Sequence, residues 1–196
     1  MVLAAGASRR FGGGKLMARL HGRPVVEHVF EAVRQARAVD LVGDAIAVIA
    51  PGDRAVAELA DRAGLRIVEN ASPGLGLSSS VRCGFQSLAP DVAAAALLLA
   101  DQPLVRVEVL AVLVAAWRTG LGTLVRPRYA DAPAEPGHPV LVDRSLWPLA
   151  DALSGERGMG ALLPAGSAGV AVIQVGGRNP DIDTPDDLTT LEGSWS

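Results

Sequence analysis

The chain has 196 residues, of which 49% are hydrophobic and 20% are charged, and its formal net charge is −3. This composition predicts one globular domain spanning residues 1–196 and excludes a disordered chain. With no basic excess and only 4% aromatic residues, nucleic acid is not an expected partner. A single cysteine excludes an internal disulfide, and no apolar run reaches the ~18 residues that a membrane span needs. We therefore expect a cytoplasmic protein that does not bind a membrane.

Short apolar runs alternate along the chain with segments whose apolar residues recur at helical spacing. This order predicts an α/β fold with three α/β/α layers and a Rossmann-like, mostly parallel sheet, in which ligands bind beyond the carboxyl ends of the strands. Residues 126–139 contain four prolines and predict a loop over the site. The predicted strands cover residues 2–5, 45–50, 65–69, 94–100, 123–125, 140–142 and 169–175. The predicted helices cover residues 24–36, 54–63, 107–117 and 144–153, and two more begin near Ser78 and at Pro185.

The first fifteen residues join a short apolar run to a loop rich in glycine and basic residues. Glycines let backbone N–H groups approach an anion closely, and the basic residues add charge that suits a polyphosphate. The sequence therefore predicts a strand that ends in a phosphate-holding loop. Its candidate residues are Gly6, Ser8, Arg9, Arg10, Gly12, Gly13 and Lys15.

Two familiar phosphate-binding motifs do not fit this loop. A P-loop needs glycine five positions before its Gly-Lys pair and Ser or Thr after the lysine, but this chain has Arg9 and Leu16 there. The dinucleotide motif G-x-G-x-x-G fails if it begins at Gly12 or at Gly74, because its third glycine would fall on Met17 or Ser79. An oxidoreductase is therefore disfavoured.

Asp101 is a candidate ligand for Mg²⁺ because it follows the strongest candidate for a central strand, at the end that faces the ligand crevice. The alternative is an ordinary turn-forming aspartate before Gln102 and Pro103. Near the carboxyl terminus, Asp181 and Asp183 would share one side of an extended segment. The following Thr184 is typical of a helix cap.

Two further segments carry polar groups that could meet a ligand. Ser78, Ser79 and Ser80 open a predicted helix, whose free N–H groups and hydroxyls could receive a base edge or a phosphate. An ordinary capped helix start is the alternative. His138, which lies between Gly137 and Pro139, could act as a general acid, donate to a phosphate or hydrogen-bond to backbone.

Taken together in this order, the motifs resemble the small nucleotidyltransferases that include the molybdopterin guanylyl- and cytidylyltransferases, the MobA-like and MocA-like proteins. The resemblance rests on segments spread over nearly the whole chain. They are Leu3-Ala-Ala-Gly-Ala-Ser-Arg-Arg-Phe-Gly-Gly-Gly-Lys15, Gly76-Leu-Ser-Ser-Ser-Val-Arg-Cys-Gly84, Asp101-Gln-Pro103, Gly137-His-Pro-Val-Leu141 and Asp181-Ile-Asp-Thr-Pro-Asp-Asp187.

The resemblance implies a fold like that of the nucleotide-diphospho-sugar transferases, and it implies roles for individual residues. The implied catalytic residues are Lys15, Arg10 and Asp101, the implied metal ligands are Asp101 and Asp183, and the implied acceptor-binding residues are Gln102, Gly137 and His138. The implied nucleotide-binding residues are Leu3, Ala4, Ala5, Gly6, Ser8, Arg9, Gly12, Gly13, Lys15, Ser78, Ser79, Ser80 and Asp101.

The resemblance also implies a reaction: an Mg²⁺-dependent transfer of a nucleoside monophosphate from an NTP to a phosphate acceptor, with release of pyrophosphate. The Gly-His-Pro-Val-Leu tract favours CTP, and the best acceptor is a molybdopterin-type cofactor, with a molybdoenzyme or its maturation factor as a possible protein partner. GTP as donor, a sugar or alcohol phosphate as acceptor, and a non-catalytic chaperone for a molybdoenzyme stay open.

Two features depart from the family pattern. The family usually has a fuller first strand before Leu3. MocA-like proteins tend to carry G-D-x-G-A-R near the acceptor site, where this chain has Gly155-Glu-Arg-Gly-Met-Gly160. The expected arginine is therefore absent at Gly160, and the acceptor stays open.

Overall fold

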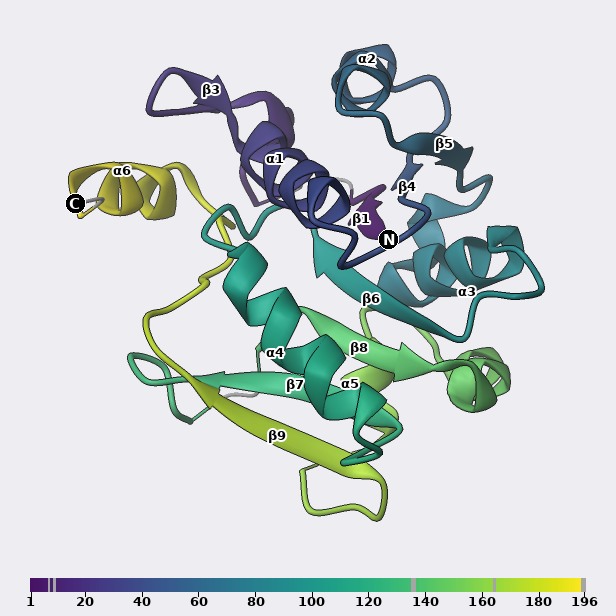
Figure 1. Cartoon of the computed structure of the whole chain (residues 1–196). Helices are drawn as coiled ribbons and strands as arrows, with labels where there is room; N and C mark the ends of the chain where they lie inside the picture. The colour runs from purple at the N-terminus through teal and green to yellow at the C-terminus, as the bar shows by residue number, and fades with distance from the viewer. Residues whose placement is uncertain (7, 9, 135–136, 164, 195–196) are drawn as a thin grey trace.

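The computed structural model describes residues 1–6, 8, 10–134, 137–163 and 165–194. A seven-stranded sheet with strand order β5-β4-β1-β6-β8-β7-β9 runs through the molecule (Figure 1). Only β8 runs antiparallel to its neighbours, β6 and β7, and the other pairs are parallel, so the predicted mostly parallel α/β sheet is confirmed. The strands are β1 Val2–Ala4, β4 Ile46–Ile49, β5 Arg66–Glu69, β6 Ala94–Leu99, β7 Leu124–Tyr129, β8 Val140–Asp143 and β9 Val170–Val175.

Helices cover both faces of this sheet, because successive strand residues point to opposite sides and both sides are apolar. Val2 and Ala4 of β1 pack under α1, α2 and α4, whereas Leu3 packs under α3, η3 and α5. The helices are α1 Val25–Ala38, α2 Arg54–Arg62, α3 Leu77–Ser87, α4 Val107–Arg118, α5 Met159–Leu162 and α6 Pro185–Gly193. The shorter elements are the 3-10 helices η1 Lys15–Met17, η2 Pro73–Leu75 and η3 Arg144–Ala152, and the strand pair β2 Arg19–Leu20 and β3 Arg23–Pro24. No described helix is long and apolar enough to cross a membrane.

The prediction that a loop begins at Arg126 was wrong, because β7 continues through Pro127 to Tyr129. The ladder between β7 and β8 ends at Val125, while the pairing with β9 extends over the whole of β7. Pro127 therefore lies where the strand no longer pairs with β8, and its missing N–H group leaves no gap in that ladder. The predicted helix 144–153 is a 3-10 helix with Pro148 inside it.

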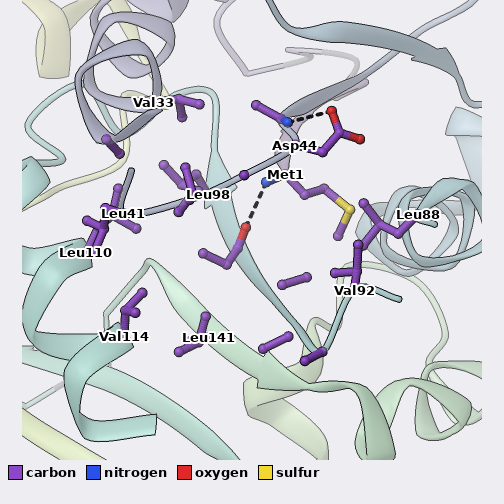
Figure 2. A pocket seen from close by; sticks show the side chains of 18 of the residues that line it. Met1, Val33, Leu41, Asp44, Leu88, Val92, Leu98, Leu110, Val114 and Leu141 are labelled. Atoms are coloured by element: carbon purple, nitrogen blue, oxygen red, sulfur yellow. Dashed lines mark hydrogen bonds between the residues drawn. The ribbon is translucent and has the colours of Figure 1, made fainter. Parts of the chain in front are cut away.

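An apolar cavity of about 320 Å³ lies at the amino end of β1, on the far side of that strand from its carboxyl end (Figure 2). Met1 lines it together with Ala94, Ala95, Ala96 and Leu98 of β6. The Met1 ammonium donates to the Ala96 carbonyl at 2.9 Å, and burial lowers its pKa to about 5. The walls are mostly aliphatic, and Arg118 is the only basic side chain among the lining residues, so this cavity lacks the cluster of basic groups that suits a triphosphate.

The segment before α6 ties the carboxyl-terminal part of the chain to the end of β6. The Ile182 N–H group donates to the Asp101 carbonyl at 3.0 Å, and its side chain is 1% exposed in an apolar cluster with Leu20, Val25 and Leu191. Directly after it, Thr184 caps α6 in a capping box with Asp187, as predicted for the cap. Asp181 and Asp183 are thereby held on either side of a buried isoleucine.

We expect Ile182→Ala to lower the free energy of unfolding by about 2–5 kcal/mol, because it leaves a cavity in this cluster. Urea denaturation would measure the change. Leu121→Ala is the matched control, since Leu121 is 61% exposed and its truncation is expected to change stability by less than ~0.5 kcal/mol. A loss below about 1 kcal/mol for Ile182→Ala would contradict the anchoring role.

Candidate nucleotide-binding cleft

A cleft of about 380 Å³ lies at the carboxyl ends of β1 and β6, where ligands of parallel sheets bind. Its floor is made by small or apolar residues of the two strand ends, which leave the backbone accessible. Its walls come from the opening loop, the start of α3 and three acidic side chains, Asp101, Glu156 and Asp183. The lining residues are Leu3, Ala4, Ala5, Gly6, Ser8, Arg10, Lys15, Leu16, Pro73, Gly74, Gly76, Leu77, Ser80, Leu99, Ala100, Asp101, Glu156 and Asp183.

The opening loop turns back on itself and directs Lys15 into the cleft. The Ser8 carbonyl accepts hydrogen bonds from the N–H groups of Phe11 and Gly13 at 3.2 and 3.1 Å. Gly12, Gly13 and Gly14 have φ of 85°, 97° and 66°, a region where a side chain would be strained. These glycines shape the loop, and neither Gly12 nor Gly13 lines the cleft. The predicted Arg9 lies outside the described residues.

Lys15 joins the two predicted metal ligands. Its Nζ lies 2.6 Å from Asp101 Oδ2 and 3.2 Å from Asp183 Oδ1, although the residue is only 8% exposed. Burial alone would lower the pKa of Lys15, but the carboxylates of Asp101 and Asp183 outweigh it and raise the pKa. Arg10, which is largely exposed, pairs with the other oxygen of Asp183 at 2.5 Å. The structure thus brings together all four residues predicted to bind metal or catalyse.

The donor set fits a magnesium ion that takes its remaining ligands from phosphates and water. Mg²⁺ is usually held by one or two protein carboxylates together with substrate phosphates, and Asp101 and Asp183 both reach one lysine nitrogen. No group of three or more His, Cys, Asp or Glu side chains that could hold a metal occurs among the described residues. Among the described residues, the cleft therefore has too few protein ligands to fill the coordination shell of a metal ion without phosphates or water.

The three predicted serines are mostly used inside the protein. The Ser78 and Ser79 hydroxyls donate to the Leu75 and Gly76 carbonyls, and the Asn70 amide donates to the Ser79 and Ser80 hydroxyls. All three serines are buried, and Ser80 alone among them lines the cleft. A direct ligand contact from Ser78 or Ser79 is therefore not supported by the geometry.

The first N–H groups of α3 also have protein partners, contrary to the expectation that they are free. The Leu77 N–H donates to Glu156 Oε2 at 3.1 Å, and the Ser78 N–H donates to the Gly155 carbonyl at 3.0 Å. Sequence reasoning named Glu156 only within the stretch 155–160 and did not predict this contact, because 79 residues separate Glu156 from Leu77. Its carboxylate takes the place at this helix start that an anionic ligand would occupy.

On the other side of Asp101, the predicted acceptor residues belong to a hydrogen-bonded cluster. Gln102 donates to Asp181 Oδ1 at 2.8 Å and accepts from the Asn179 amide at 3.2 Å. The His138 carbonyl accepts from the Tyr129 hydroxyl at 2.8 Å. Sequence reasoning missed Asn179, whose only signal was its place just before the acidic segment at 181–187.

The cluster holds two groups in their neutral forms more readily than in solution. Burial is the largest influence on His138 and lowers the pKa of its imidazole to about 4, with Asp101 opposing and Arg126 adding to the shift. Burial, followed by the charge of Asp101, raises the pKa of Asp181. The His138 imidazole is therefore neutral at neutral pH, which does not favour its use as a general acid.

The chain is similar to known proteins that carry two different names, a cytidylyltransferase and a guanylyltransferase. The chain is 32% identical over 124 residues to 3-deoxy-manno-octulosonate cytidylyltransferase of Anaeromyxobacter sp. strain Fw109-5, a match over 60% of this chain and 48% of the relative. It is 27% identical over 140 residues to a protein of Thermococcus gammatolerans named "Probable molybdenum cofactor guanylyltransferase", over 70% of this chain and 65% of that protein. The chain thus spans about half and about two thirds of these relatives' lengths.

Solved structures superpose on this chain over nearly its full length. Rv0371c of Mycobacterium tuberculosis H37Rv superposes with a TM-score of 0.82 and 27% identity, covering 98% of this chain and 96% of that one. A structure of Rv0371c in complex with manganese superposes with a TM-score of 0.77 and 26% identity, covering 99% and 97% of the two chains.

The resemblance drawn from the sequence motifs is confirmed by the match to a family model. That model describes the MobA-like NTP transferase domain and matches residues 1–170, which include the opening loop, Asp101 and the predicted acceptor residues. The seven-stranded sheet and the cleft beside Lys15 are consistent with this match. The chain belongs to the family of MobA-like NTP transferase domains.

Proposed function

We propose that this protein is a nucleotidyltransferase that moves a nucleoside monophosphate from an Mg²⁺-bound NTP, preferentially CTP, to a phosphate-bearing acceptor. The preferred acceptor is a molybdopterin-type cofactor, and the second product is pyrophosphate. The observation that carries the proposal is the placement of the buried Lys15 ammonium between Asp101 and Asp183, inside a cleft at the carboxyl edge of a parallel sheet.

The residues around the cleft suit a triphosphate. Lys15 and Arg10 supply two positive charges, and the accessible backbone of Ala5 and Gly6 lies at the end of β1. Both cations are already paired with carboxylates, so they are held in place before a ligand arrives. When phosphate oxygens enter, the cations can exchange a carboxylate for a phosphate without crossing the cleft.

Asp101 and Asp183 would hold the magnesium ion. Each pairs with Lys15 through one carboxylate oxygen, and these carboxylates would become available to the ion when Lys15 turns to a phosphate. When bound, such an ion stabilises the negative charge that builds up on the phosphates during transfer. Manganese in the Rv0371c complex supports a divalent ion as cofactor for proteins of this fold, and Mg²⁺ is our proposal for this chain.

The reaction needs no nucleophile from the protein. An oxygen of the acceptor phosphate attacks the α-phosphorus and forms a new P–O bond, while the bond between the α-phosphorus and the bridging oxygen of the β-phosphate breaks. The attacking oxygen is already anionic, so no base is required to remove a proton. The protein contributes alignment and charge stabilisation from Lys15 and Arg10. A neutral His138 agrees with a mechanism that has no general acid.

CTP is our preferred donor because of the Gly137-His-Pro-Val-Leu141 tract and the cytidylyltransferase among the relatives. The relative named as a guanylyltransferase keeps GTP as the second candidate. Pyrophosphate release, measured with each of the four NTPs, Mg²⁺ and a panel of molybdopterin and phosphate monoester acceptors, tests the proposal. Cofactor binding without pyrophosphate release with any NTP would favour the chaperone instead.

We expect Asp101→Asn to lower pyrophosphate release by at least about 10³-fold, because it removes a carboxylate that would hold the metal and pairs with Lys15. The variant should still fold, with a lower thermal midpoint, because Asp183 is then the one carboxylate paired with Lys15 among the described residues. Asp61→Asn, a change of an exposed carboxylate on α2, is the matched control and should leave turnover unchanged. Near-wild-type turnover in Asp101→Asn would show that the metal assignment is wrong.

The buried, neutral His138 makes stability depend on pH. Its pKa is lowered to about 4 in the folded protein from 6.5, so its contribution is complete above pH 6.5 and is lost as the pH falls toward 4. The loss is at most about 3 kcal/mol, because each unit of pKa difference between the folded and unfolded protein corresponds to ~1.4 kcal/mol.

We expect the free energy of unfolding of the wild type to fall more steeply than that of His138→Gln between about pH 7 and pH 5. Urea denaturation of both proteins across this range measures the difference. Parallel pH profiles would mean that His138 is hydrated in the folded state.

A further inference from the structure

Arg126 on β7 is a buried cation with no counter-ion among the described residues. The residue is 4% exposed, and its Nε finds no hydrogen-bond partner in that part of the chain. Its one hydrogen bond among the described residues is a long contact of 3.4 Å from Nη1 to the Gly160 carbonyl. No carboxylate in the described part of the chain forms an ion pair with it. A buried guanidinium with unmet donors is costly unless an anion accompanies it.

Arg128 repeats this arrangement two residues further along the same strand. Residues i and i+2 of a strand share a face, so both side chains lie on the face that α5 covers. Arg128 is partly buried, and its Nε also lacks a partner. Burial, followed by the charge of Arg128, lowers the pKa of Arg126. The two arginines therefore repel each other with no opposite charge paired to either of them in the described structure.

The pair lies on the acceptor side of the cleft. β7 runs parallel to β6, since each is antiparallel to β8, so the carboxyl ends of β6 and β7 lie at the same edge of the sheet. The Asn179 amide donates to the Gln102 side chain at 3.2 Å and to the His138 carbonyl at 3.4 Å, and the Tyr129 hydroxyl donates to the same carbonyl at 2.8 Å. These contacts join Tyr129 at the end of β7 to Gln102, the residue after Asp101, so the strand that carries Arg126 ends beside the predicted acceptor residues.

Gly160 makes room for this arginine. A Cβ added to Gly160 would come within 2.8 Å of Arg126 Nη1, so the guanidinium occupies the space of a side chain at 160. Gly160 is also the position at which the G-D-x-G-A-R pattern would place an arginine. A guanidinium group is therefore present at this place in the fold, although it is supplied by β7 and not by α5.

We propose that Arg126 and Arg128 form an oxyanion subsite that binds the anionic group of the acceptor, which is a phosphate if the proposed function is correct. Two guanidinium groups with free Nε donors suit the paired oxygens of a phosphate or a carboxylate. The inference rests on the proposed function for the identity of the acceptor. The binding of an oxyanion can be measured without turnover.

The test is calorimetric titration with inorganic phosphate in the presence of Mg²⁺ and α,β-methylene CTP, which fills the triphosphate side. We expect Arg126→Met to weaken phosphate binding by about 10- to 100-fold, the loss typical of a charge-assisted pair. Arg62→Met is the matched control, because Arg62 is exposed on α2 and does not line the cleft, so its loss should leave phosphate binding unchanged. Acetate serves as the carboxylate probe, and the tighter of the two anions identifies the group on the acceptor.

Stability separates a binding role from a structural one. Without phosphate, Arg126→Met should melt at the same temperature as the wild type or higher, because an unpaired buried charge is replaced by an apolar side chain. Arg126→Lys should retain part of the affinity, since it keeps the charge but loses the paired donors. In the Arg126→Met background, Gly160→Arg should restore phosphate binding from α5.

Failure of this inference and failure of the proposed function give different results. Mg²⁺-dependent stabilisation by CTP reports on the triphosphate side and should persist in Arg126→Met. If phosphate binds Arg126→Met as tightly as the wild type, or does not bind the wild type at all, the subsite does not exist. A lower melting temperature for Arg126→Met together with unchanged phosphate affinity would assign Arg126 a structural role.

Discussion

The pairing of the Lys15 ammonium with Asp101 and Asp183 is the interaction on which the cleft depends. A buried ammonium must be accompanied by carboxylates, and these two lie 86 and 168 residues away in the sequence. The opening loop, the end of β6 and the segment before α6 must therefore meet at one point. Ile182 holds the segment before α6 against the end of β6, because its N–H group donates to the Asp101 carbonyl and its side chain is buried.

Much of this arrangement could be predicted from the sequence, because it follows from local patterns and one general rule of parallel sheets. Apolar runs located the strands, and the carboxyl ends of parallel strands meet at one edge, which placed Asp101 near the opening loop. Thr184 followed by Pro185 is a typical helix start, and α6 begins there. Lys15 and Asp183 were assigned through resemblance, and the structure places them within hydrogen-bond distance of each other.

The parts that could not be predicted depend on contacts between distant segments. The Glu156 carboxylate at the start of α3 and the Asn179 amide on Gln102 involve partners more than 70 residues apart. The four prolines of residues 126–139 suggested a loop, but the register with β9 allows the strand to pass through Pro127. That extension also decides where Arg126 points, so the arginine pair was invisible to local reasoning.

The basic side chains on the two proposed sides of the cleft differ in whether they are paired with carboxylates, and this difference affects which anion each side would bind. On the triphosphate side, Lys15 and Arg10 are paired with carboxylates, so an entering phosphate must compete with Asp101 and Asp183. That competition favours a phosphate that brings a divalent cation to the freed carboxylates. On the proposed acceptor side, Arg126 and Arg128 have no carboxylate to displace among the described residues, so we expect a bare anion to gain their full attraction. Keeping a buried charge without a partner in the described structure costs stability, which is the pattern expected where binding, and not packing, fixes the residue.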